Sequence, residues 1–296
     1  RLLRGQPLGA REHAVKRRRR RRPAPVRNDH RADPGQDAER HFGQLHPRAA
    51  LGDECMAAHR QLEAAAEQLR QQAPEGVRVR TSAGDVTADA DVAAAVALAD
   101  ADQTLRIVVA SAGDGTMGPV VATSTEEWNR ILGVTLTGVF LVFREAGAAI
   151  VRNGGGSMVA VSSVASRLTH RFMAPYSVAK AGVDMLVKVT ADELGRAGVR
   201  VNAVNPGIIR TDLVAMIEEE SSVGQSYLNN TPLGRFGEVG DVAPLIRFLC
   251  GPESGFITGE TVGADGGHHL RDGPDYLEWA EGLYGDAAHG RVPAPE

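Results

Sequence analysis

The chain has 296 residues, of which 43% are hydrophobic, so it is long enough to form one large α/β domain with a sizeable core. No uninterrupted apolar run approaches the ~18–20 residues that span a bilayer, so we expect no membrane segment and a cytoplasmic location. The two cysteines, Cys55 and Cys250, suggest neither a disulfide framework nor a metal site. His268 and His269 would point to opposite faces of a strand, so we predict no metal there and the start of a solvated tail.

The first sixty residues differ from the rest of the chain in charge. They include six consecutive arginines at 17–22. With 15 Lys/Arg against 7 Asp/Glu, the segment carries a net charge of +8. The whole chain carries −4, so residues 61–296 carry −12. Three interpretations stay open: a basic disordered tail, a targeting peptide, and translation out of frame from GC-rich DNA. A targeting peptide is disfavoured because the segment lacks an apolar core run. Nucleic-acid binding is disfavoured because only one linear run supports it.

Strand and helix patterns alternate through the remaining chain. We predict strands at 77–81, 105–109, 157–163 and 199–204, each a short apolar run. We predict helices at 88–99, 125–151, 174–196 and 241–249, the last beginning with an acidic cap. Alternation of this kind predicts an α/β fold with a doubly wound parallel sheet. Residues 272–296 show no obvious contribution to a core and are expected to form a C-terminal extension.

Tyr176 and Lys180 are the most informative pair in the chain. Four residues apart, they lie on one face of the predicted helix, one turn from each other. A tyrosine has an ordinary pKa of ~10, and a nearby ammonium favours the phenolate and lowers that value, which suits the phenol for acid–base work. Ser163 ends the preceding predicted strand, at the sheet edge where open α/β sheets bind their ligands. The pair alone would be surface decoration, but these surroundings favour an active site.

This stretch resembles the short-chain dehydrogenase/reductase family, and most of all its 3-oxoacyl-carrier-protein-reductase-like members. The match rests on Ser163, the Tyr176/Lys180 spacing, and the segments 84–87, 205–211, 232–237 and 257–267. It covers roughly residues 62 to 270. The resemblance implies a Rossmann-like fold, NAD or NADP as cofactor, and a small secondary alcohol or ketone as substrate. It also implies a homotetramer, and a mobile lid at residues 213–231.

The resemblance also implies a role for each site residue. Tyr176 would exchange a proton with the substrate oxygen, Lys180 would hold the nicotinamide ribose, and Ser163 would orient the substrate. Thr135 stands where the family has an asparagine that anchors a proton-relay water, and it can substitute if the relay uses the backbone carbonyl. The residues expected to bind the dinucleotide are Asp85, Val86, Ala110, Ser111, Ala112, Gly113, Tyr176, Lys180, Pro206, Gly207, Ile209 and Thr211.

Two departures from the family pattern stand out. The family has Asn-Asn-Ala-Gly after its fourth strand, and this chain has Ala110-Ser111-Ala112-Gly113, so we expect weaker packing of that loop. The first strand and the Thr-Gly-x3-Gly-x-Gly loop are not recognisable before residue 62, and translation out of frame would account for their loss. The alternative to an active oxidoreductase is therefore a catalytically impaired relative that acts as a binding or structural protein. The sequence leaves open the substrate and the choice between NAD and NADP.

Overall fold

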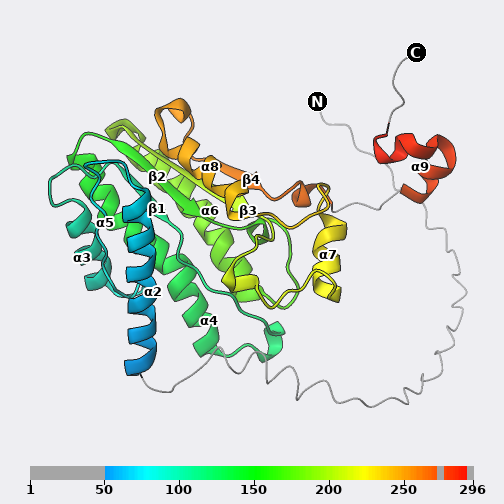
Figure 1. Ribbon diagram of the computed structural model, residues 1–296, viewed down its shortest axis with the longest axis horizontal. Helices are drawn as coiled ribbons and strands as arrows, with labels where there is room; N and C mark the ends of the chain where they lie inside the picture. Colours follow the sequence, from blue (N-terminus) through cyan, green and yellow to red (C-terminus); the bar gives the residue numbers. More distant parts are fainter. Residues whose placement is uncertain (1–50, 272–276, 292–296) are drawn as a thin grey trace, which may run out of the picture. The chain divides into compact units, whose positions relative to one another are not determined.

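A computed structural model describes residues 51–271 and 277–291, and the basic run at 17–22 lies outside the described residues. Within them, parallel strands form one sheet in the order β1-β2-β3-β4 (Figure 1). The strands are β1 Ile107–Ala110, β2 Gly156–Val161, β3 Val199–Pro206 and β4 Thr261–Ala264. The register places Ala110 beside Ala160 and Ala160 beside Ala203. Each strand-to-strand connection contains a helix, as parallel pairing requires.

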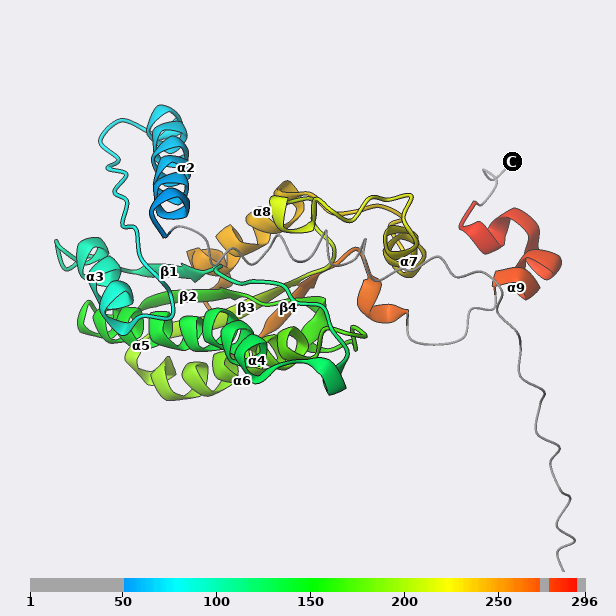
Figure 2. The same cartoon turned by 90° about the horizontal axis from the view of Figure 1, so that it is seen from below.

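Helices lie on both faces of the sheet, which confirms the predicted doubly wound α/β class (Figure 2). Helices α5 and α6 pack against one face, and α8 packs against β2 and β3 from the other. The helices are α2 Leu51–Gln72, α3 Asp89–Ala99, α4 Thr125–Leu132, α5 Gly138–Arg152, α6 Ala174–Leu194, α7 Ser222–Asn230, α8 Val239–Cys250 and α9 Leu277–Tyr284. At the start of α8, Glu238 is the capping residue, and Asp241 completes a reciprocal capping box with it.

Apolar side chains fill both interfaces between the sheet and its helices. The larger cluster joins α5 and α6 to the sheet through residues such as Phe143, Ile150 and Val187. A second cluster lies under α8 and includes Val204 and Leu249. Burial of this surface, at roughly 25 cal/mol per Å², is the main stabilising contribution to the fold. The same packing brings the carboxyl ends of β1, β2 and β3 to one edge of the sheet.

The predicted helix 125–151 forms as two α-helical segments joined by a π-helical turn, Gly133–Thr137. In the described part of the chain, Thr125–Arg152 is the one helix long and apolar enough to cross a membrane, although no uninterrupted apolar run in the sequence indicated it. Half of that apolar window is buried, with Val139 and Phe143 packed in the core. The segment is thus a core helix of the α/β domain.

The predicted strand at 77–81 does not form. Residues 77–85 have no regular secondary structure and no strand partner among the described residues, and β1 pairs with β2 alone. A groove of about 350 Å³ lies between β1 and residues 82–86, and Ile107 and Val109 on β1 are 49% and 40% exposed. A strand needs a hydrogen-bonded neighbour to persist. In the described residues no strand lies between the run at 77–81 and β1, so this run has no partner to pair with.

The small residues of the α5 and α6 helices serve the chain's own packing. Ala146 and Ala149 are buried, a Cβ on Gly147 would meet Leu194 at 3.3 Å, and one on Gly182 would meet Leu136 at 2.9 Å. Small residues on long helices can also mark a contact between subunits, but the positions of these residues inside the domain give no support to a subunit contact through them. Four larger apolar side chains remain 44–58% exposed on the same helices, namely Phe140, Val178, Met185 and Val189.

We predict that those exposed side chains are covered by another copy of the chain. Helix pairing across a two-fold axis would remove them from water, and the family resemblance extends this to a homotetramer. Light scattering at micromolar concentration should therefore give four times the mass of one chain. Met185→Glu should shift the mass toward the monomer, while Lys188→Glu on the same helix serves as a control for added charge. A monomeric mass for the unaltered folded protein would contradict this prediction.

Candidate active site

Ser163, Tyr176 and Lys180 meet at the carboxyl end of β2, as the sequence predicts. Ser163 is the second residue after β2, and its Oγ accepts a hydrogen bond from the backbone N–H of Ala165 at 3.1 Å. The phenol of Tyr176 lies close enough to Ser163 for the serine to lower the tyrosine pKa, against the larger opposing effect of burial. Tyr176 and Lys180 lie on the first turns of α6, with the ammonium 5.6 Å from the centroid of the tyrosine ring. The three side chains thus gather at one place in the fold.

Lys180 is almost completely buried, with 4% of its surface exposed. Its Nζ donates a hydrogen bond to the backbone carbonyl of Val161 at 2.8 Å. Burial lowers the pKa of Lys180 to about 8, and the carboxylate of Asp184 offsets part of that effect. The folded protein therefore holds a lysine whose charge is costly in the absence of a ligand.

Replacing Lys180 by methionine should stabilise the folded protein at pH 7. From the fall in pKa, charging this lysine in the folded state costs roughly 3 kcal/mol at most, and loss of its hydrogen bond to Val161 reduces the net gain to about 1–3 kcal/mol. Between about pH 8 and the ordinary value of 10.5, the unfolded chain keeps a proton that the folded chain has lost, so the wild type gains stability as pH rises. The advantage of the variant should shrink across that window.

Thermal melting at several pH values measures this difference. Lys188→Met is the matched control because Lys188 lies exposed on the same helix. It should change stability by less than about 0.5 kcal/mol at every pH. A Lys180→Met variant that is no more stable than the wild type at pH 7, or an advantage that stays constant up to pH 10.5, would show that burial of the ammonium is not costly.

The pKa of Tyr176 is raised, opposite to the expected direction. Burial disfavours the phenolate and raises the pKa, and the approach of Ser163 lowers it only in part. The ammonium of Lys180 lies over the ring face and donates to Val161. Tyr176 is therefore a protonated phenol at neutral pH in this state, suited to donate a proton to an oxygen beside Ser163.

Asp184 is a site residue that the sequence analysis missed. It is 9% exposed, and its Oδ2 accepts from the Ser166 hydroxyl at 2.6 Å and from Asn205 Nδ2 at 3.3 Å. Asn205 also donates to the Ser166 Oγ at 2.8 Å. These contacts tie α6 to the turn after Ser163 and to the end of β3. The spacing 176, 180, 184 was a usable signal, because residues four apart repeat on one helix face.

Thr135 and Gly113 lie beside the lysine. Thr135 is fully buried on the π-helical turn, and its Oγ1 accepts from the backbone N–H of Asp114 at 3.3 Å. A Cβ placed on Gly113 would come 3.4 Å from Lys180 Nζ and 3.9 Å from Thr135 Oγ1. The predicted loop 110–113 therefore reaches Lys180, and the threonine hydroxyl accepts a hydrogen bond from the backbone just after that loop. π-Helical turns are frequent at functional sites.

The other predicted dinucleotide residues fall into two groups. Pro206 and Gly207 end β3, and Gly207 packs closely enough on Asp265 that an added Cβ would lie 3.0 Å from its Cα. Farther along, the hydroxyl of Thr211 donates to the Ile209 carbonyl at 3.4 Å. Asp85 and Val86 lie along the groove beside β1, where Asp85 Oδ1 accepts from the Thr87 N–H at 2.8 Å. Ala110 ends β1, and Ser111 and Ala112 are exposed in the loop that follows.

An aromatic cluster that the sequence analysis missed lies near the phenol. The ring centroids of His170, Tyr227 and His268 are 5.7–6.2 Å apart, and Phe236 lies 6.5 Å from Tyr227. Burial raises the pKa of Tyr227, and the neighbouring Tyr176 adds to that effect. His268 is buried, so the expected solvated tail does not begin at this residue.

The neighbour of His268 is held by an ion-pair partner. The Nδ1 of His269 lies 2.8 Å from Asp265, and Asp265 Oδ2 also accepts from the backbone N–H of His269 at 2.9 Å. Hydrogen bonds from His269 and from the Gly267 backbone lower the pKa of Asp265 against the opposing effect of burial. The segment after β4 is therefore fixed beside the site.

Comparisons with known proteins show which family the chain resembles. The model of the enoyl-(acyl carrier protein) reductase family matches residues 49–269. The chain is 32% identical over 186 residues to galactitol 2-dehydrogenase (L-tagatose-forming) of Cereibacter sphaeroides, covering 62% of this chain and 73% of that protein. It is 38% identical over 162 residues to (3R)-3-hydroxyacyl-CoA dehydrogenase of Rattus norvegicus, covering 54% of this chain and 62% of the rat protein.

Solved structures give the same assignment. A short-chain type dehydrogenase/reductase from Mycobacterium ulcerans superposes with a TM-score of 0.69 at 40% identity, over 78% of this chain and 85% of that one. A gluconate 5-dehydrogenase from Burkholderia cenocepacia, solved with NADP and tartrate, gives 0.65 at 30% identity, over 70% and 82%. The chain belongs to the short-chain dehydrogenase/reductase family, a family of oxidoreductases, which confirms the predicted resemblance.

Proposed function

We propose that this protein interconverts a small secondary alcohol and a ketone with NAD or NADP, at a site formed by Ser163, Tyr176 and Lys180. The observation that carries the proposal is the grouping of a serine, a half-buried phenol and a buried ammonium at the carboxyl end of β2. Cytoplasmic residence and assembly as a tetramer belong to the same proposal. The family relationship supports all of these points.

Each residue has a chemical task in this proposal. When bound, the nicotinamide supplies or accepts the hydride. Tyr176, protonated at neutral pH, gives its proton to the carbonyl oxygen during reduction and accepts one during oxidation. Ser163 donates a hydrogen bond to the same oxygen, which orients the substrate and stabilises developing charge. Lys180 brings positive charge close to the phenol, which favours the phenolate when the proton has left.

The described residues suit only part of a dinucleotide. Beside Lys180, Gly113 leaves a space that a side chain would occupy, and the ammonium makes one hydrogen bond, to Val161, and can donate two more. Those features suit the ribose and nicotinamide. The pyrophosphate needs a row of backbone N–H groups at a helix N-terminus, and we find no glycine-rich loop of that kind in the described residues. The aromatic cluster around Tyr227 would form the wall of the substrate site.

A substrate panel tests the proposal. The panel should contain sugar alcohols and 3-hydroxyacyl thioesters, because relatives carry the names galactitol 2-dehydrogenase and 3-hydroxyacyl-CoA dehydrogenase. Formation of NADH or NADPH is followed for this chain and for a completed version, in which residues 1–60 are replaced by the corresponding N-terminal part of the Mycobacterium ulcerans relative. Turnover of any secondary alcohol by the completed version supports the proposal. Absence of turnover across both classes and both cofactors would favour a non-catalytic binding protein.

A further inference from the structure

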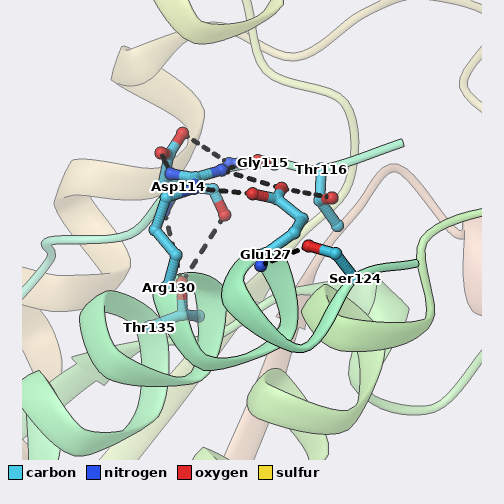
Figure 3. Close-up of polar contacts among 7 residues, drawn as sticks. All are labelled: Asp114, Gly115, Thr116, Ser124, Glu127, Arg130 and Thr135. Carbon is cyan, nitrogen blue, oxygen red and sulfur yellow. Dashed lines mark hydrogen bonds and ion pairs between the residues drawn. The ribbon is translucent and has the colours of Figure 1, made fainter. Parts of the chain in front are cut away.

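The loop after β1 is held by a network centred on Arg130 of α4 (Figure 3). The Arg130 guanidinium forms an ion pair with Asp114 and donates to the Gly115 carbonyl at 3.2 Å. It also contacts both oxygens of Glu127, at 2.8 Å and 2.9 Å. Thr116 donates its hydroxyl to Glu127 at 2.7 Å. One planar guanidinium therefore joins three consecutive loop residues, directly or through Glu127, to the start of a helix.

The helix itself is firmly placed, so the network can transmit its position to the loop. Ser124 caps α4 by accepting a hydrogen bond from the Glu127 N–H at 3.1 Å. The Arg130 side chain is 32% exposed and that of Glu127 is 25% exposed, so solvent screens these contacts only in part. The pKa of Arg130 is raised, mainly by its hydrogen bonds to Glu127 and also by Asp114. These contacts are charge-assisted, and such hydrogen bonds are stronger than neutral ones.

The loop 114–116, which Arg130 holds, begins next to Gly113 and so lies close to Lys180. Asp114 follows Gly113, and the space above Gly113 is bounded by Lys180 Nζ at 3.4 Å and Thr135 Oγ1 at 3.9 Å from an added Cβ. The backbone N–H of Asp114 also donates to that threonine hydroxyl at 3.3 Å. A shift of the loop would therefore change the space beside the ammonium. The small residues at 111–113 contribute little packing of their own, since Ser111, Ala112 and Gly113 are exposed.

We propose that Arg130 is a positioning residue, which holds Gly113 against Lys180 by clamping the loop 114–116 to α4. The clamp supplies the loop packing that larger polar side chains at 110–113 would otherwise give. This proposal rests on the proposed function, since it assigns the loop to the cofactor site. Arginine is required because its planar fork reaches a carboxylate, a carbonyl and a second carboxylate at once, whereas a lysine ammonium offers a single point of charge.

Hydrogen exchange of the loop amides in the full chain tests the clamp without any cofactor. Arg130→Met should speed exchange at residues 113–116 by about tenfold or more, because the loop loses its charge-assisted contacts. Arg130→Lys should give an intermediate rate. Arg144→Met is the matched control, because Arg144 also contacts two carboxylates, Glu145 at 2.8 Å and Asp89 at 3.0 Å. It should leave exchange at the loop unchanged.

Kinetics of the completed version separate positioning from general stabilisation. Arg130→Met should raise the KM for NADH or NADPH about tenfold and change kcat by less than about threefold, with partial rescue in Arg130→Lys. Unchanged loop exchange in Arg130→Met overturns the proposal. An equal increase in exchange across all of α4 and the sheet also overturns it. If Arg130→Met does not fold, the proposal is overturned when the loop amides of Arg130→Lys exchange at the wild-type rate. If neither version binds a dinucleotide, the proposed function is refuted. The exchange experiment still tests the clamp in that case, because it uses no cofactor.

Discussion

Replacing Tyr176 by phenylalanine should lower turnover by about 10²–10⁴-fold, the contribution typical of a general acid or base. The phenol lies beside Ser163 and is protonated at neutral pH, so the substitution removes the proton donor and leaves the ring. The effect should appear in kcat, because the hydroxyl acts in the proton-transfer step. Dinucleotide affinity should be nearly unchanged, because the hydroxyl is not needed to bind the cofactor. Steady-state kinetics of the completed version measure both quantities.

Tyr227→Phe is the comparison for this variant. Its phenol lies near Tyr176 and packs on His170 and His268, so the substitution removes a neighbouring hydroxyl while keeping the aromatic wall. We expect a loss of less than about tenfold, in line with one weakened substrate contact. A Tyr176→Phe variant that keeps more than about a tenth of the activity would remove Tyr176 from the proton-transfer step.

Completing the N-terminal part should raise affinity for NADH and NADPH by about 100-fold or more relative to the chain as it stands. A glycine loop and a helix N-terminus would add several backbone N–H donors to the pyrophosphate, and each charge-assisted hydrogen bond contributes about 1.5–3 kcal/mol. The added strand would also cover Ile107 and Val109 on the open edge of β1. We therefore expect a higher melting temperature and less aggregation as well.

Cofactor fluorescence and thermal melting of the two versions give the comparison. The control carries the Mycobacterium ulcerans segment with its loop glycines changed to alanine, which keeps the strand and removes close approach to the phosphates. That control should recover the melting temperature and not the affinity. If the chain as it stands binds either cofactor at about low-micromolar Kd, with a cooperative melt, then translation out of frame is the wrong interpretation of residues 1–60.

The sequence predicted for a physical reason that Ser163, Tyr176 and Lys180 lie close together. Tyr176 and Lys180 share a helix face through their spacing, and Ser163 follows an apolar strand, so local rules and parallel topology place all three. The direction of the Tyr176 pKa was predicted wrongly. That direction depends first on burial and then on the approach of Ser163, neither of which is encoded locally.

Other features depend on contacts between distant segments. The run at 77–81 has strand composition, yet it forms no strand. In the described residues no other strand lies beside it to pair with. The clamp of Arg130 on Asp114 joins residues 16 apart that no periodicity relates. His170, Tyr227 and His268 come from three separate segments, so their meeting follows from the fold alone. Small residues such as Gly147 indicated a subunit contact but serve internal packing.

Transfer of isotope from the cofactor to the substrate tests the central claim most directly. The completed version is incubated with NADH or NADPH deuterated on the transferring face of the nicotinamide, together with ketones of the substrate panel, and the alcohol product is analysed by mass spectrometry. Our account predicts one deuterium on the carbinol carbon of the product, and loss of nearly all labelled product in Tyr176→Phe. An alcohol without label, or labelled product at the wild-type rate in Tyr176→Phe, would contradict hydride transfer at this site.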